Sequence, residues 1–408
     1  MHQPGRQFLH TPGPSAIPDR VLNAMHRQPL DLSDPQLAEI VQSCLDDLKL
    51  AFATAGDVFI YAANGHGGWE AALSNIFAPG ETALVPETGY FSESWASHAR
   101  MLGIDTQIMP GDIRRAIDPD RLEATLRGDG AGRIKAVLVV HADTATGVAS
   151  DIRALRAAID AARHPALLVA DVVASLGAAP FRMDEWGVDV AIGASQKALM
   201  GPPGLAFIAA NPRARAAAVS VSRPRHYWDW EYRAGVEGYR RFCGTAPEHG
   251  LFALQAALNM LREEGLVAVQ HRHARLARAV WRAVEAWGVA GDLCVNALRP
   301  DERSTSVTTI LTPSGFDSGR IREHARECRG VALGGGLGAL AGRAFRIGHL
   351  GDLNEPMILG CLAAVELTLR DLGLRCGRDG LPAAIESLAS SGSPPGAPKT
   401  PRPVAVPA

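Results

Sequence analysis

Residues 193–204 read GASQKALMGPPG, and this stretch, with Lys197 at its centre, decides how the fold is interpreted. The apolar run at 188–192 predicts a short buried strand before it, and a turn too rich in glycine and proline to be helical leads to a second strand at 205–208. We therefore expect Lys197 at a strand end, held at the edge of a sheet. A lysine is costly to bury unless its amine is used, as in a Schiff base with a carbonyl cofactor; a solvated loop lysine is the alternative.

Short apolar runs alternate with helix-length segments between residues 55 and 210. The runs are continuous rather than alternating, which indicates strands covered on both faces and hence a mainly parallel sheet between helices. Sites in such α/β sheets gather at the carboxyl ends of the strands. The expected strands are 58–62, 82–85, 134–140, 166–170 and 188–192, and the expected helices are 69–77, one ending at Arg100, and 152–163.

Composition excludes several classes of function. With 408 residues, 47% of them hydrophobic, and a formal net charge of −2, neither nucleic acid nor a membrane is expected as a partner. No signal peptide is recognised, and the longest apolar run, 166–180, is broken by Asp171. The six cysteines lack metal-ligand or redox spacing, so we expect no metal site and reduced thiols in a cytoplasmic enzyme.

The second half of the chain predicts a smaller unit. A long helix at 251–285 bridges to it, and strands are expected at 306–311 and 344–347, with helices at 318–328 and 356–372. The last residues are rich in serine, glycine and proline, which is typical of disorder. The expected division is an N-terminal arm at 1–16, a large domain at 17–262, a small domain at 263–386 and a disordered tail at 387–408.

Polar residues follow three of the predicted strands. The glycine-rich turn at 64–68 (NGHGG) precedes a helix, and free N–H groups there would suit a phosphate. Asp171 ends an apolar strand, where it could pair with a protonated pyridine nitrogen or cap a helical turn. Residues 141–147 (HADTATG) offer polar groups for a phenolic oxygen or a phosphate.

The order of these motifs resembles the class V, fold-type I pyridoxal-phosphate aminotransferases, especially the serine–glyoxylate and alanine–glyoxylate group. The resemblance runs from 11–15 (TPGPS) to 346–354 (RIGHLGDLN), almost the whole chain. It implies an α/β fold with a mainly parallel seven-stranded sheet in the large domain and a smaller α+β C-terminal domain. It also implies pyridoxal 5′-phosphate as cofactor and a homodimer with shared active sites.

The resemblance assigns roles to individual residues. Lys197 matches the Schiff-base lysine and Asp171 the carboxylate that pairs with the pyridine nitrogen; both count as catalytic. The other cofactor contacts it implies are Gly65, His66 and Gln196 near the phosphate, Val173 under the ring, Phe91 stacked on it, Thr144, and Thr245 reaching the phosphate from the neighbouring subunit. Substrate contacts are expected from Arg346, which would clamp the α-carboxylate, and from Ser15, Glu248 and His249.

In the phosphate-binding turn, Asn64 stands where serine or threonine is common. Near the site entrance, the tyrosine usual near the shared threonine has no obvious counterpart, with Phe242 and Tyr239 before Thr245. Residues 246–249 (APEH) stand where serine–glyoxylate enzymes show an apolar and proline-rich stretch, and the early segment 29–35 lacks the Asp-His-Arg of those enzymes. The aromatic segment 223–230 (RPRHYWDW) is either a pocket wall or a contact between subunits.

The expected reaction is a ping-pong transamination from alanine, serine or an aspartate-like donor to glyoxylate or pyruvate. One alternative is a class V lyase such as a desulfurase or kynureninase. A desulfurase needs a reactive cysteine on a mobile loop, for which Cys328 is a weak match. The other alternative is a non-catalytic aminotransferase-like regulator.

Overall fold

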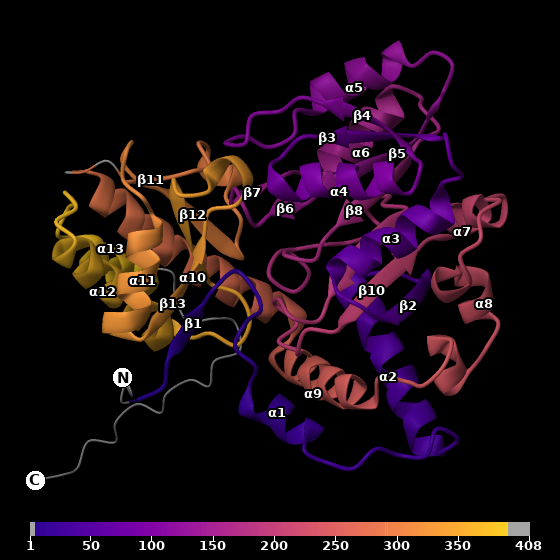
Figure 1. The fold of residues 1–408 in the computed structure, drawn as a ribbon, viewed down its shortest axis with the longest axis horizontal. Helices are drawn as coiled ribbons and strands as arrows, with labels where there is room; N and C mark the ends of the chain where they lie inside the picture. The colour runs from indigo at the N-terminus through magenta and orange to yellow at the C-terminus, as the bar shows by residue number, and fades with distance from the viewer. Residues whose placement is uncertain (1–4, 290, 292, 391–408) are drawn as a thin grey trace, which may run out of the picture.

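The computed structural model describes residues 5–289, 291 and 293–390, which form a large and a small α/β unit side by side (Figure 1). The large unit is built on a seven-stranded sheet that is parallel except for β10, which runs antiparallel to both of its neighbours. This confirms the predicted α/β class and the mainly parallel sheet. Across the sheet, the strands are β2 (Asp57–Ala62), β10 (Leu205–Ala210), β9 (Val190–Ala194), β8 (Leu167–Asp171), β5 (Ile134–Val140), β3 (Thr82–Pro86) and β4 (Asp105–Met109).

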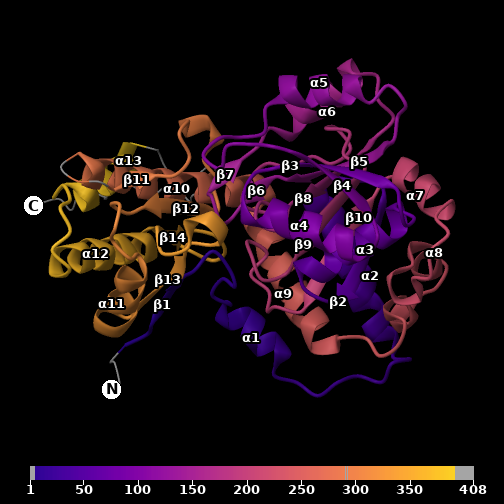
Figure 2. The same ribbon diagram turned by 45° about the horizontal axis from the view of Figure 1, so that its top comes forward.

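Helices cover both faces of this sheet because alternate strand residues point to opposite sides and nearly all are apolar. One face packs against α2, α5, α6 and α9, and the other against α3, α4 and α7 (Figure 2). The helices of the large unit are α1 (Asp19–Met25), α2 (Pro35–Phe52), α3 (Gly65–Ile76), α4 (Tyr90–Met101), α5 (Pro119–Gly128), α6 (Ile152–Ala161), α7 (Pro212–Val219), α8 (Trp230–Ala234) and α9 (Glu248–Glu264).

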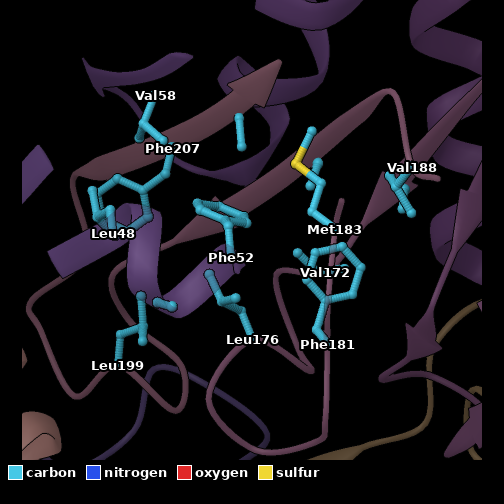
Figure 3. Packing of buried hydrophobic residues seen from close by; sticks show 14 of the residues in the cluster. Leu48, Phe52, Val58, Val172, Leu176, Phe181, Met183, Val188, Leu199 and Phe207 are labelled. Carbon is cyan, nitrogen blue, oxygen red and sulfur yellow. The ribbon is translucent and has the colours of Figure 1, made fainter. Parts of the chain in front are cut away.

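The core beneath the lysine loop is densely packed. Phe52 of α2 meets Phe181 edge to face at 6.5 Å, with Leu176 and Phe207 beside it (Figure 3). Leu199, two residues after Lys197, is fully buried in the same cluster. The loop that carries the lysine is therefore anchored from below by apolar packing.

The small unit has a five-stranded sheet in the order β1-β13-β14-β12-β11. Its first strand comes from the N-terminal arm, because β1 pairs in parallel with β13. The strands are β1 (Phe8–His10), β13 (Val331–Gly335), β14 (Ala344–Gly348), β12 (Val307–Leu311) and β11 (Cys294–Val295), and the helices are α10 (Leu266–Gly288), α11 (Gly319–Arg329), α12 (Glu355–Asp371) and α13 (Gly380–Ser390). A two-stranded hairpin, β6 (Ala142–Asp143) and β7 (Val148–Ala149), lies between β5 and β8 in the chain order.

Several boundaries differ from the prediction. The single helix expected at 251–285 is wrong, because Gly265, with φ of 86°, separates α9 from α10. The glycine-rich turn at 65–68 is itself the first turn of α3. The tail expected from 387 starts too early, since α13 continues to Ser390, and the rest of it, 391–408, lies outside the described residues. Within the described part of the chain, no helix has the length and apolar character needed to cross a membrane.

Candidate active site

A cleft opens beyond the carboxyl ends of β5, β8 and β9. Eight of the predicted site residues line it together. The lining residues are Asn64, Gly65, His66, Trp69, Phe91, Val140, Ala142, Thr144, Asp171, Val173, Ala174, Gln196 and Lys197.

Lys197 enters the cleft from the loop after β9, as the sequence predicted. Its Nζ donates to the carbonyl oxygen of Pro12 in the N-terminal arm. Burial and, to a smaller extent, the nearby Arg346 charge lower the pKa of this amine to about 8, while the Asp171 charge opposes the shift. A side chain at Gly13 would lie 2.5 Å from the lysine, so only glycine lets the arm approach so closely. The site therefore holds a buried amine that is easily deprotonated.

Asp171 ends β8 and faces the same cleft. Its Oδ1 accepts the backbone N–H of Val173 at 2.7 Å, and its Oδ2 accepts Nε1 of Trp69 at 2.8 Å. Burial raises the pKa of this carboxyl to about 6, although both hydrogen bonds and the Lys197 charge act in the opposite direction. The carboxylate caps the following turn, as one interpretation of the sequence predicted, and it also lines the cleft; its pairing with a pyridine nitrogen stays a prediction.

The start of α3 differs from the expected open phosphate site. Asn64 is its N-cap, and its Oδ1 accepts the N–H groups of His66 at 3.1 Å and Gly67 at 3.2 Å. The prediction of free N–H groups is therefore wrong for these two residues. Nearby, Oε1 of Gln196 is buried in the cleft wall and has no hydrogen-bond donor among the described residues.

Arg346 and Ser15 lie close to the lysine although neither is part of the cleft lining. Arg346 on β14 donates from Nε to the carbonyl of Gly335 at 2.6 Å and from Nη1 to that of Thr144 at 2.8 Å. Burial lowers its pKa to about 10. Ser15 uses its hydroxyl to bind the carbonyl oxygen of Lys197 at 2.9 Å. Ser15 thus fixes the lysine loop, and its predicted contact with substrate stays a prediction.

Asp143 is a buried carboxylate whose part in the site the sequence indicated only loosely. It accepts the N–H groups of Ala145 at 2.8 Å and Phe91 at 3.1 Å, which fixes the Phe91 ring at the cleft wall. Burial raises its pKa to about 6, and the nearby Asp171 adds to the effect. His141, from the same motif, instead packs its ring toward Phe181 and Trp186, and it does not line the cleft.

Three predicted residues lie away from the cleft within this chain. Thr245 is exposed at the surface before α9. Glu248 accepts the N–H of Leu30 at 2.6 Å, and Nε2 of His249 lies 2.9 Å from the carbonyl oxygen of Arg27. These two side chains therefore hold the segment between α1 and α2, and a substrate contact for them stays a prediction.

The aromatic segment 223–230 packs on the outside of α3. Asn75 of α3 binds it three times, donating to the carbonyl of Trp228 at 2.7 Å and accepting from Nε of Arg225 and the N–H of Trp230. Tyr61 donates to the same Trp228 carbonyl at 2.9 Å. The segment supports the helix at the cleft from behind and does not line the cleft.

The comparison with family models decides the identity of this arrangement. The model for class V aminotransferases matches residues 8–336, which include the cleft, the N-terminal arm and Lys197. The chain belongs to this family. As a class V aminotransferase it is an enzyme that transfers amino groups, and its family uses pyridoxal phosphate.

Curated relatives and solved structures agree with this assignment. The aminotransferase is 44% identical over 379 residues to the serine–glyoxylate aminotransferase of Methylorubrum extorquens, covering 91% of this chain and 93% of that protein. It is 40% identical to the L-aspartate–glyoxylate aminotransferase of Paracoccus denitrificans, covering 90% and 92%. The structure of ureidoglycine–glyoxylate aminotransferase from Bacillus subtilis matches with a TM-score of 0.87 at 26% identity, covering 95% and 99%.

Proposed function

We propose that this aminotransferase takes the amino group of serine, aspartate or alanine and delivers it to glyoxylate, with pyridoxal phosphate bound in the cleft around Lys197. The convergence of Lys197 and Asp171 on one cleft carries the proposal. The choice of acceptor is supported by the relatives, since those named above from M. extorquens and P. denitrificans are both glyoxylate aminotransferases.

The residues present fit the cofactor. Lys197 offers a buried amine for its aldehyde, and Asp171 offers a buried carboxylate for its ring nitrogen. Val173 and Phe91 supply apolar cleft walls for the ring. Gln196 also lines the cleft, where its side-chain amide nitrogen would donate a hydrogen bond to the phosphate. When bound, pyridoxal phosphate supplies an aldehyde that holds the amino group and a ring that takes up the electron pair left at Cα.

Lys197 is suited to move the proton at the donor Cα. Its lowered pKa of about 8 leaves a substantial neutral fraction near neutral pH, and a general base works best when its pKa lies near the working pH. The N-terminal arm and the packed loop beneath hold the amine in one place. The amine can therefore take the Cα proton and return it on the same face.

Arg346 is suited to bind the substrate carboxylate. The carbonyls of Gly335 and Thr144 fix the guanidinium through Nε and Nη1. Nη2 donates to no acceptor in the described part of the chain, so it remains available to a carboxylate oxygen. Glyoxylate and the amino donors all carry that group, which explains how one site serves both half-reactions.

A homodimer is part of the proposal. We place Thr245 at the neighbouring subunit's phosphate end because it is exposed here and lies outside the cleft of its own chain. Sedimentation should give a dimer, and Thr245→Val should weaken cofactor binding without dissociating that dimer. A monomer with full activity would refute this placement.

Two experiments test the function. Borohydride reduction of the holoenzyme followed by peptide mapping should fix a pyridoxyl group on Lys197. A panel of serine, aspartate and alanine against glyoxylate and pyruvate should give its fastest turnover with glyoxylate. Faster turnover with pyruvate for every donor would overturn the acceptor, and a label on another residue would overturn the site.

The lyase alternative has no support from the site. Cys328 lies on helix α11 and not on a loop at the cleft, and the lining of the cleft contains no cysteine. The regulator alternative is contradicted by the family assignment.

A further inference from the structure

We propose that the indole N–H of Trp69 is the positioning group for Asp171, fixing its carboxylate in the orientation that the cofactor's ring nitrogen requires. The inference rests on the proposed function. Trp69 stands five residues into α3, and its role is separate from the phosphate role of that helix's first turn.

The hydrogen bonds leave the carboxylate no freedom to rotate. Oδ1 is held by the backbone of Val173, which belongs to the turn after β8, and Oδ2 is held by Trp69 from α3. Because the two donors come from different elements, rotation of the carboxylate would break both bonds at once. Asp171 therefore presents one fixed edge to the cleft.

The indole itself is held in place by other rings. Trp95 of α4 stacks on Trp69 with centroids 5.4 Å apart and planes 13° from parallel. The ring of His66 lies at 4.4 Å and that of His98 at 5.5 Å. Both indoles are almost completely buried, with 2% of Trp69 and none of Trp95 exposed. Trp69 cannot swing away from Asp171 without disrupting this stack.

A neutral donor suits this task better than a cation. An arginine or lysine in the place of Trp69 would neutralise Asp171 and weaken its hold on a protonated pyridine nitrogen. The indole N–H orients the carboxylate and leaves its negative charge available. Its hydrogen bond also lowers the pKa of Asp171, opposing the burial that raises it to about 6, so the bond favours the charged form.

The structure offers a matched control. Trp95 has the same side chain as Trp69, is similarly buried and stacks directly on it, but its Nε1 has no hydrogen-bond acceptor among the described residues. Trp69→Phe and Trp95→Phe therefore remove the same atoms, and only the first removes a bond to Asp171.

The first test uses the apoprotein in a double-mutant cycle. The unfolding equilibrium constant at pH 7 is measured for Trp69→Phe, Asp171→Asn and the double variant. A hydrogen bond to a charged group should make the double variant depart from the product of the single effects by about tenfold. The cycle of Trp95→Phe with Asp171→Asn should show less than about a twofold departure. Equal coupling in the two cycles, or none in the first, would overturn the inference.

A second measurement leaves Trp69 unchanged and so does not depend on Trp69→Phe folding. In Trp95→Phe apoprotein, tryptophan fluorescence should change with a midpoint near pH 6 as Asp171 gains a proton. Asp171→Asn in that background should remove the transition. Persistence of the transition would show that Trp69 does not sense Asp171.

In the holoenzyme, Trp69→Phe should lower kcat about tenfold while KM for the amino donor changes less than about twofold. The acidic limb of the kcat profile should move to higher pH, because Asp171 loses a donor that favours its charged form. Trp95→Phe should leave both unchanged. Failure of the borohydride label at Lys197 would defeat the proposed function, whereas an uncoupled apoprotein cycle with a labelled Lys197 would defeat only this inference.

Discussion

Asn64 caps the first turn of α3, and a cofactor phosphate could bind there only by displacing this cap. Its Oδ1 binds the N–H groups of His66 and Gly67, the groups that a phosphate would use. Replacing an asparagine N-cap by alanine costs about 1 kcal/mol. We expect Asn64→Ala to lose that amount in the apoprotein and to lose almost nothing in the holoenzyme, where the phosphate takes over the cap.

The difference between the two states fixes the effect on binding. If Asn64→Ala lowers the free energy of unfolding of the apoprotein by about 1 kcal/mol and leaves that of the holoenzyme unchanged, its dissociation constant for pyridoxal phosphate should be about fivefold lower. Urea unfolding of the apoprotein measures the loss of stability, and titration with cofactor measures the dissociation constant. Asp151→Ala is the matched control, because Asp151 caps α6 through Arg153 and Ala154 in the same way but does not line the cleft.

Asp151→Ala should therefore destabilise the apoprotein by a similar amount and leave cofactor binding unchanged. Weaker binding in Asn64→Ala would refute the reasoning, since it would mean that the asparagine amide itself holds the phosphate.

The remaining predictions concern the charged residues of the cleft. Lys197→Ala should lower turnover by about 100- to 10,000-fold or more, measured with any accepted donor; near-normal turnover would exclude it as the base. Single-turnover proton transfer by Lys197 should speed up as pH rises and level off above about 8, the pKa that burial gives it; a rate that falls over this range would exclude the neutral amine as the active form. Because burial raises the pKa of Asp171 from 3.8 to about 6, the folded apoprotein binds that proton more tightly than the unfolded chain, and stability falls as pH rises through this range. Asp171→Asn should thus stabilise the apoprotein at pH 7 by about 2 kcal/mol, because removing the buried charge contributes about 3 kcal/mol and losing one hydrogen bond costs about 1 kcal/mol. Urea unfolding should show this stabilisation at pH 7 and none near pH 4. Destabilisation at pH 7 would contradict the prediction.

The sequence predicted well those features that depend on the pattern of neighbouring residues. Strands β5 and β8 are largely apolar runs, and polar residues at or just after their ends, Thr144 beyond β5 and Asp171 at the end of β8, meet at the cleft. Lys197 and Asp171 were placed correctly at strand ends, because Asp171 ends the buried strand β8 and Lys197 comes three residues after the buried strand β9. The small-unit elements β12, β14, α11 and α12 are confirmed within a few residues.

The features that escaped prediction depend on tertiary contacts. Strand β4 at the sheet edge is largely exposed at Asp105 and Gln107, so it shows no apolar run. Strand β13 ends in glycines and is recognisable only through its partners. Trp69 stood in a quoted motif, but its bond to Asp171 joins residues 102 positions apart. No local pattern could indicate that bond, although an aromatic residue one turn into a helix beside a predicted site was a usable signal.

The pairing of β1 with β13 has a consequence for how the chain is made. Phe8 pairs with Val331, so the first strand to be synthesised can pair only after more than 300 further residues have left the ribosome. Until then we expect Pro12 and Ser15 not to form their hydrogen bonds with Lys197, because β1, which anchors them, lacks its partner strand β13. The nascent chain should therefore acquire its buried amine last, so a ribosome-bound protein lacking only the small unit would be folded in part and inert.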